Sequence, residues 1–115
     1  MHELSLAGEV IRIAESEAVR NKAKSVSEIT VEIGTLAGIE IDSFESALGI
    51  LASGSMLEKA RLKIQRIRGT GICPECGKEF GMSQRLDLCP ECKILPIEIK
   101  GGHEFRVVSI VIEEE

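Results

Sequence analysis

The sequence predicts an α+β fold, a small three-stranded sheet with two helices on one face and an inserted cysteine-rich module. Three observations support this prediction. Two segments repeat apolar residues with the spacing of a helix, and three segments have the alternation or the apolar content of a strand. All four cysteines and all three prolines lie in one glycine-rich stretch, residues 69–102, between the last two of these strands.

Two helices are expected because apolar residues recur at steps of three and four positions. The first covers residues 4–24, and its apolar stripe is Leu4, Ala7, Ile11, Ala14 and Ala18. The second follows Asp42, which has the spacing of a capping box with Glu45, and its stripe is Phe44, Ala47, Leu48 and Leu51. Each stripe predicts a helix that packs on a sheet through one face.

Three strands are expected around these helices. Residues 27–34 and residues 60–65 alternate apolar with polar side chains, and residues 105–112 form a long apolar strand before an acidic tail. Glycine pairs at 69/71 and 101/102 indicate hinges on either side of the cysteine-rich stretch. We therefore expect one α/β domain made of residues 1–68 and 103–115, with residues 69–102 as a second domain.

The composition argues against several classes of function. The chain has 115 residues and a mass of 12.5 kDa, a formal net charge of −5, and only 3% aromatic residues. Nucleic-acid binding is not expected, because the net charge is negative and few rings can stack on bases. No apolar run approaches the roughly 18–20 residues of a membrane span, and no signal peptide is visible. We therefore expect a cytoplasmic protein in a reducing compartment, where close cysteines bind metals rather than form disulfides.

The four cysteines form two copies of one tetrapeptide, Cys-Pro-Glu-Cys, with twelve residues between the copies. Two sulfurs three positions apart on a tight turn can bind one metal ion together, and the proline sets φ for that turn. Gly77 after the first copy suits a left-handed exit from the turn, whereas Lys93 after the second suits it less well. Two such turns offer four thiolates in a tetrahedron, the closed arrangement of structural zinc. The module is thus predicted to be a zinc ribbon on Cys73, Cys76, Cys89 and Cys92.

Other interpretations of the cysteines remain open. A four-sulfur site binds iron with the same geometry, as in rubredoxin-like proteins, and colour would distinguish ferric thiolate from zinc. Two redox-active pairs are disfavoured, since no segment resembles a thioredoxin βαβ unit. A nucleic-acid finger is disfavoured because residues 73–92 carry Lys78 and Arg85 against four acidic residues.

The amino terminus offers a second metal site. The α-amine of Met1 and the backbone nitrogen of His2 can close a five-membered chelate ring, and the same backbone nitrogen and His2 Nδ1 can close a six-membered ring. The amide of Glu3 or another donor can then fill the fourth corner of a plane. Square-planar nitrogen ligation favours Ni(II) or Cu(II) over Zn(II). The alternative is an ordinary helix start, with Glu3 near the positive end of the helix dipole.

Together these features resemble the HypA family, the nickel-incorporation accessory proteins of [NiFe]-hydrogenase maturation. The resemblance rests on Met1-His2-Glu3-Leu4-Ser5-Leu6 followed by a helix, and on two CPxC pairs separated by twelve residues. It also includes Glu32-Ile33-Gly34-Thr35-Leu36 at the end of the first predicted strand, and a closing strand that runs into acidic residues. The resemblance spans the whole chain.

The resemblance implies a nickel metallochaperone that binds Ni(II) transiently through Met1, His2 and Glu3, with a structural Zn(II) on the four cysteines. It implies delivery of nickel to [NiFe]-hydrogenase, and in some organisms to urease, together with a nickel-binding GTPase and the hydrogenase large subunit. Residues 1–68 and 103–115 are then the nickel-binding domain, and residues 69–102 are the zinc-binding domain. The oligomeric state is not fixed by the sequence, and a homodimer is one arrangement that it allows.

Two rival functions are also consistent with the sequence. One is a zinc-ribbon interaction module in which His2 is accidental, and the other is a rubredoxin-like electron carrier. No enzymatic activity is expected, because no nucleophile–base pair or carboxylate pair has a recognisable spacing. His103 lies outside the core motif of the family and is expected at the surface, and Thr35 stands where family members often carry a charged residue.

Overall fold

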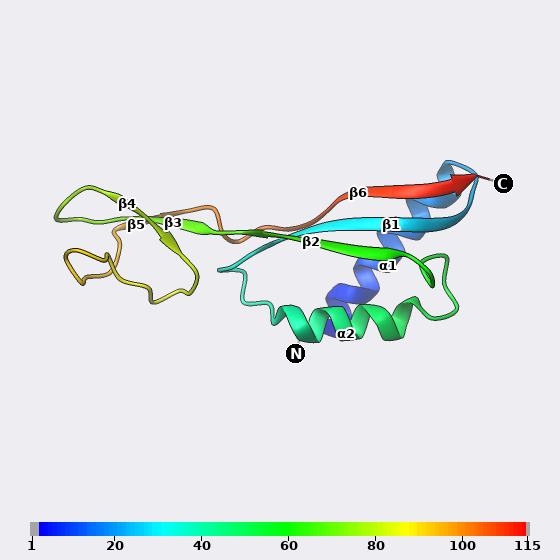
Figure 1. Cartoon of the computed structure of the whole chain (residues 1–115), viewed down its shortest axis with the longest axis horizontal. Coiled ribbons are helices and arrows are strands. Elements are labelled where there is room, and N and C mark those ends of the chain that lie inside the picture. Colours follow the sequence, from blue (N-terminus) through cyan, green and yellow to red (C-terminus); the bar gives the residue numbers. More distant parts are fainter. Residues whose placement is uncertain (1–2, 115) are drawn as a thin grey trace. The chain divides into compact units, whose positions relative to one another are not determined.

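A computed structural model describes residues 3–114; Met1, His2 and Glu115 lie outside the described residues. Figure 1 shows the helices α1 (Glu3–Arg20) and α2 (Ile41–Ala52) and the strands β1 (Ala23–Gly34), β2 (Arg61–Ile67), β3 (Gly69–Ile72), β4 (Glu79–Met82), β5 (Glu98–Lys100) and β6 (Phe105–Glu114). The strands form two sheets, ordered β2–β1–β6 and β4–β3–β5.

The chain divides into two compact units. The first holds the residues up to Val31, Ile39–Gln65 and the residues from Arg106 on, and the second holds Glu32–Gly38 and Arg66–Phe105. The segment 32–38 therefore groups with the cysteine-rich stretch, because Gly34, Thr35 and Leu36 donate backbone hydrogen bonds to Glu104, Ile67 and Gly102. The domain boundaries expected from the sequence stay a prediction.

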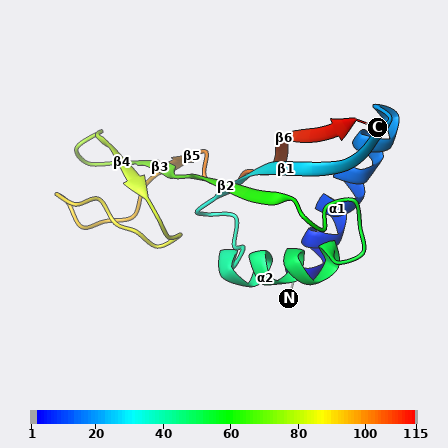
Figure 2. The ribbon, with the colours of Figure 1, turned by 45° about the vertical axis from the view of Figure 1, so that its right-hand side comes forward.

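The first unit confirms the predicted α+β class. Both helices lie on the same side of the β2–β1–β6 sheet (Figure 1; Figure 2). The side chains of β1 alternate as predicted except at Thr30, since Ile29, Val31 and Ile33 are buried whereas Glu28 and Glu32 are only half-buried. Thr30, expected on the outer face, is buried. The period-two pattern of this strand thus reports which of its faces meets the helices.

The helices pack against the sheet and each other through small residues and one ring. The buried face of α1 consists of four residues of the predicted stripe and, in place of Leu4, Val10: Ala7, Val10, Ile11, Ala14 and Ala18. Leu4 is 50% exposed. On α2 the Phe44 side chain is fully buried, which contributes roughly 1.5–3 kcal/mol to folding. Neither helix of residues 3–114 is both long and apolar enough to cross a membrane.

The predicted capping box at the start of α2 is wrong. The helix begins at Ile41, and its N-cap is Glu40, with φ −79° and ψ 105°. Asp42 is already inside the first turn, so it has helical backbone angles and cannot act as the cap. In the part of the chain that the structure describes, the Glu40 side chain makes no capping hydrogen bond; the carboxylate of Glu3 instead accepts the Glu40 N–H over 3.0 Å.

The second unit is built on a sheet that the sequence did not predict. β3 pairs antiparallel with β4, in the register Gly69↔Met82, and with β5, in the register Thr70↔Lys100. Gly69 and Gly71, which were expected to be hinges, lie in β3. A Cβ on Gly69 would collide with Leu36 Cδ1, so this glycine is required by packing rather than by flexibility.

The core of the second unit surrounds the cysteines. Its buried members are Leu36, Cys73, Phe80, Met82 and Cys89, and the half-buried Cys92 and Ile94 pack against them. Three large apolar side chains and two cysteines cannot supply much burial energy, so this unit needs a further source of stability.

Candidate metal centre

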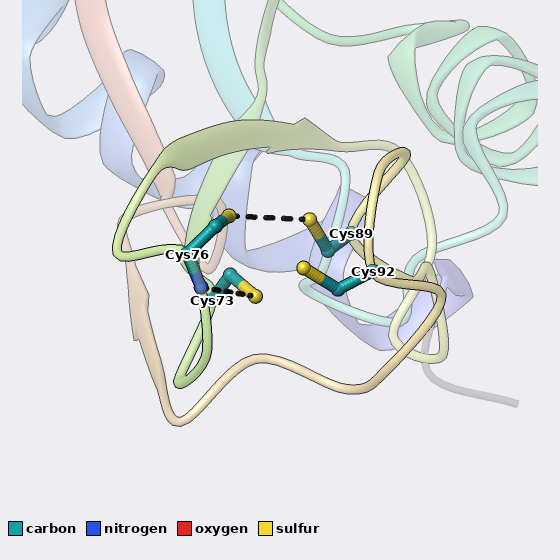
Figure 3. Close-up of side chains that lie close together, drawn as sticks. All are labelled: Cys73, Cys76, Cys89 and Cys92. Carbon is teal, nitrogen blue, oxygen red and sulfur yellow. Dashed lines mark hydrogen bonds between the residues drawn. The ribbon is translucent and has the colours of Figure 1, made fainter.

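The four cysteine sulfurs converge on one point. They lie within 4.8 Å of one another, and Cys76 Sγ and Cys89 Sγ are 3.8 Å apart (Figure 3). A tetrahedral zinc ion with Zn–S bonds of ~2.3 Å has S···S edges of about 3.8 Å. Among the described residues, this is the one group of histidine, cysteine and carboxylate side chains that is arranged to hold a metal ion. The cluster therefore fits a single tetrahedral ion.

The first pair of cysteines lies on a turn closed by two backbone hydrogen bonds. The Cys73 N–H donates to the Lys78 carbonyl over 3.0 Å, and the Gly77 N–H donates to the Cys73 carbonyl over 3.0 Å. Gly77 has φ 74°, which confirms the predicted left-handed exit. This turn aims Cys73 and Cys76 at the same point.

The second pair repeats the first turn bond for bond. The Cys89 N–H donates to the Ile94 carbonyl over 3.0 Å, and the Lys93 N–H donates to the Cys89 carbonyl over 2.9 Å. Lys93 takes the place of Gly77 and has φ 59°, a conformation that lysine rarely adopts. The duplicated tetrapeptide thus folds into a duplicated metal-binding turn.

Hydrogen bonds give the cysteine thiols different pKa values. The backbone N–H of Cys76 donates to Cys73 Sγ over 3.5 Å, and this hydrogen bond is the main reason that the pKa of Cys73 is lowered to about 7. A hydrogen bond with Cys73 is the main reason that the pKa of Cys92 is raised to about 12. Without metal, Cys73 is therefore about half ionised at pH 7, whereas Cys92 keeps its proton. A divalent cation lets all four sulfurs ionise together.

The sulfurs differ in their access to solvent. Cys73 and Cys89 are buried, whereas Cys76 and Cys92 are more accessible. Lys78 Nζ and Glu91 Oε1 form an ion pair of 2.9 Å between the two turns, with both side chains more than half exposed. Such an exposed pair contributes little to stability, so the packing of the turns depends mainly on the buried core around the cysteines.

Of the predicted nickel ligands, Met1 and His2 lie outside the described residues, and Glu3 begins α1. Glu3 Oε2 accepts the hydrogen bond from the Glu40 N–H, which is the contact that replaces the expected cap of α2. The sequence gives no signal for this contact, because it joins residues 37 positions apart. The residue next to His2 is therefore fixed to the start of α2.

The two residues that depart from the family pattern lie in the second unit. His103 is exposed, as expected. Thr35 is half-buried, and its hydroxyl donates to the Met82 carbonyl over 2.9 Å. Thr35 thus holds the 32–38 segment against β4, beside the core that Leu36 enters. The importance of Leu36 was not recognised from the sequence, which places it in an apolar turn without a periodic signal.

The closed four-sulfur centre on a small α+β fold defines a metal-binding protein whose centre keeps no open position for a substrate. The family model described as "Hydrogenase/urease nickel incorporation, metallochaperone, hypA" matches residues 1–112. The chain belongs to this HypA family, as the resemblance indicated.

Individual relatives agree over the full length of the chain. A hydrogenase maturation factor HypA of Parabacteroides distasonis is 42% identical, with 100% of both chains covered. One of Francisella philomiragia is 40% identical over 96% of this chain and 98% of its own. The solution structure of the Ni metallochaperone HypA from Helicobacter pylori is similar with a TM-score of 0.68 and 26% identity over 100% of both chains. The sequence relatives and the similar solved structure therefore indicate the same family.

Proposed function

We propose that this protein binds Ni(II) through Met1, His2 and Glu3 and delivers it during [NiFe]-hydrogenase maturation. The observation that carries the proposal is the family match, which begins at residue 1 and so includes the terminal Met-His-Glu. The family description also names urease, and we propose urease as a second client.

Ni(II) is a cargo, and a site at the chain terminus suits a cargo. The α-amine, the His2 backbone nitrogen and His2 Nδ1 are three nitrogens for a square plane, which Ni(II) prefers and Zn(II) does not. All three must be unprotonated to bind. We therefore expect nickel affinity to fall as the pH drops through the imidazole pKa, ~6.5 in the unperturbed side chain.

Glu3 has two groups with different roles in this proposal. Its carboxylate accepts the Glu40 N–H, so that group is engaged with the start of α2. Its backbone nitrogen is the nearest further donor to the His2 chelate rings. We therefore assign the backbone nitrogen of Glu3 to the fourth corner of the plane and its carboxylate to positioning.

Zinc is the ion that we assign to Cys73, Cys76, Cys89 and Cys92. The 3.8 Å sulfur separation and the closed donor set support a structural role, and the small core around the cysteines needs the energy that an ion supplies. Because all four positions are filled by protein, we propose a carrier and not an enzyme.

The proposed partners follow from the family. They are a nickel-binding GTPase and the hydrogenase large subunit, and the proposed compartment is the cytoplasm, with no nucleic acid and no membrane involved. A homodimer is compatible with this role.

One added residue tests the nickel site. A glycine placed before Met1 moves the α-amine away from His2 without changing any side chain of the chain. We expect Ni(II) affinity, measured by calorimetry on untagged protein, to fall by at least about a hundredfold, since even outer-shell changes commonly cost 10–100-fold. Zinc content and far-UV circular dichroism should stay unchanged.

Two substitutions complete the test. His2→Ala should weaken nickel binding as strongly as the added glycine, and the matched control His103→Ala should leave it within about twofold, because His103 is exposed and outside the chelate. Unchanged nickel affinity in the extended protein would support the rival function, a zinc-ribbon interaction module without a nickel role.

A further inference from the structure

The strand β2 is the edge of the first unit's sheet that lies beside α2 (Figure 1; Figure 2). Within residues 3–114 it pairs with β1 alone, so the backbone N–H and C=O groups along its other side can receive a further strand. Its side chains alternate, since Arg61 and Lys63 are exposed whereas Leu62 and Ile64 are half-buried. The edge therefore has one polar and one apolar face.

The polar face of this edge is cationic. Arg61 and Lys63 lie on it, and Lys59 comes two positions before Arg61, with no acidic residue between Lys59 and Lys63. Lys63 Nζ lies 3.4 Å from Glu28 Oε2 of the neighbouring strand. In the part of the chain that the structure describes, Lys59 and Arg61 make no ion pair. In a chain with a net charge of −5, this edge is a local excess of positive charge that suits an acidic partner.

A hollow of about 230 Å³ lies beside the apolar face of β2. Its apolar lining includes Leu48 and Gly49 of α2 and Ala60 and Leu62. Two acidic residues, Glu45 and Glu58, also line it. A Cβ on Gly49 would meet no atom within 4 Å, so the space beside this glycine is open. The hollow therefore suits an apolar side chain and disfavours an acidic one.

We propose that β2 receives an extended acidic segment of a partner protein as an added strand. Acidic and apolar side chains alternate along that segment, so that the acidic ones face Arg61 and Lys63 and an apolar one enters the hollow beside Gly49. Backbone hydrogen bonds to β2 supply the binding, and the two faces supply the specificity. This proposal does not depend on the nickel role.

The same cations restrict which strand can bind. Charged side chains on an edge strand commonly prevent pairing with another edge, and Arg61 and Lys63 disfavour any strand that is basic or apolar on its outer face. An acidic strand turns these charges into cross-strand attraction. Because side chains alternate, a slip by one position would place the acidic residues against Glu45 and Glu58. The edge therefore selects both the charge and the register of its partner.

A synthetic peptide tests the selection by charge. The probe is a blocked, fluorescently labelled peptide of seven residues, the length of β2, in which glutamate alternates with valine. We expect it to bind untagged, zinc-loaded protein with a Kd of about 0.1–1 mM, measured by fluorescence anisotropy, because the interface is small. A probe with lysine in place of glutamate, and one with all its glutamates before its valines, should each bind at least about tenfold more weakly.

A pair of charge reversals tests which edge receives the probe. Arg61→Glu should lower the affinity for the acidic probe about tenfold, since an attractive cross-strand pair becomes repulsive. The matched control Arg106→Glu makes the same change of charge on β6, at the opposite edge of the sheet, and should leave the affinity within about twofold. Equal losses in the two variants would overturn the proposal, because the attraction would then belong to the charge of the whole protein.

One substitution tests the hollow without weakening the fold. Gly49→Leu should fill the space beside α2 and lower the affinity for the acidic probe at least about fivefold. Its thermal stability should be unchanged or higher, because leucine has a better helix propensity than glycine. Unchanged affinity in this variant would contradict the entry of an apolar side chain into the hollow.

Amide hydrogen exchange locates the added strand without any variant. A saturating concentration of the acidic probe should slow exchange in β2 and leave β6 unchanged. Protection of β6 instead of β2, or equal binding of the acidic and basic probes, would overturn the proposal. Tighter binding of a single-stranded oligouridylate than of the acidic probe would also overturn it, because the cations of this edge would then serve a nucleic acid.

Discussion

Gly77 and Lys93 occupy equivalent places in the two cysteine turns, where each donates its backbone N–H to the cysteine carbonyl four residues earlier. Their φ angles are 74° and 59°. Glycine adopts this left-handed backbone freely, whereas a residue with a Cβ loses roughly 1–2 kcal/mol there. The second turn therefore carries strain that the first one avoids.

Substitutions at these two positions should change the stability of the zinc-loaded centre in opposite directions. Gly77→Ala is expected to cost about 1 kcal/mol, and purely through φ, because its Cβ would meet no atom within 4 Å. Lys93→Gly relieves strain but gives the unfolded chain more freedom, so we expect a net gain of about 0.5 kcal/mol. Equilibrium competition with a zinc chelator measures both. Weaker zinc retention in Lys93→Gly would contradict the strain assigned to the second turn.

Substitution of Gly69 should disrupt the core around the cysteines. Gly69→Ala places a Cβ against Leu36 Cδ1, and overpacking of this kind costs roughly 1–3 kcal/mol. Leu36→Ala should also destabilise the unit, but the double variant should be more stable than the sum of the two losses predicts, because the collision is gone. Thermal unfolding of the zinc-loaded protein gives the double-mutant cycle.

The matched control for this cycle is Gly49→Ala. Gly49 lies in α2 with no atom within 4 Å of its Cβ position, so alanine should stabilise the helix by about 0.5–1 kcal/mol. Strict additivity of Gly69→Ala and Leu36→Ala would show that the two side chains do not compete for the same space.

The elements predicted from the sequence are those with a long periodic signal. α1, α2 and β1 bury most of the side chains that their repeats indicate, although Leu4 of α1 and Leu51 of α2 are exposed. The Cys-x-x-Cys spacing correctly brought four sulfurs together. β3, β4 and β5 were missed because they have only three or four residues each and β3 contains two glycines, which weaken any strand pattern.

Contacts between residues far apart in the sequence could not be predicted from local sequence patterns. The capping box of Asp42 and Glu45 satisfied a local rule, but the Glu40 N–H found its acceptor on Glu3 instead. In the same way, Leu36 belongs to an ordinary turn by sequence and enters the cysteine core by tertiary packing. Both contacts depend on how the segments meet, which one sequence read along the chain does not reveal.

Zinc uptake should release protons. In the metal-free cluster the pKa of Cys92 is raised to about 12, chiefly by its hydrogen bond with Cys73, so this thiol is protonated at pH 8. The pKa of Cys73 is lowered to about 7 by its hydrogen bond from the Cys76 N–H, so Cys73 is already largely ionised at that pH. A backbone hydrogen bond from Lys78 lowers the pKa of Cys76, but burial and the hydrogen bonds with Cys73 and Cys89 raise it overall, so this thiol is protonated as well. Binding then displaces the protons of Cys92 and Cys76 and releases little from Cys73.

The number of protons released per zinc ion should increase as the pH falls. As the pH falls through about 7, Cys73 also takes up a proton, so more protons compete with zinc and its affinity decreases. Calorimetry in two buffers with different ionisation enthalpies counts the protons released per zinc at pH 8 and at pH 6. A proton count that does not increase at the lower pH would be inconsistent with the lowered pKa of Cys73.

The carboxylate of Glu3 should stabilise the first unit by closing the start of α2. Glu3→Ala removes the acceptor of the Glu40 N–H and should cost about 1 kcal/mol, as the loss of a helix cap does. Glu3→Gln keeps an acceptor oxygen and loses only the favourable charge at the helix start, so about half of that cost is expected. Glu45→Ala, an exposed glutamate in the same helix, is the control and should be near neutral. Urea unfolding gives the three values, and equal losses for Glu3→Ala and Glu45→Ala would show that the contact with Glu40 contributes nothing.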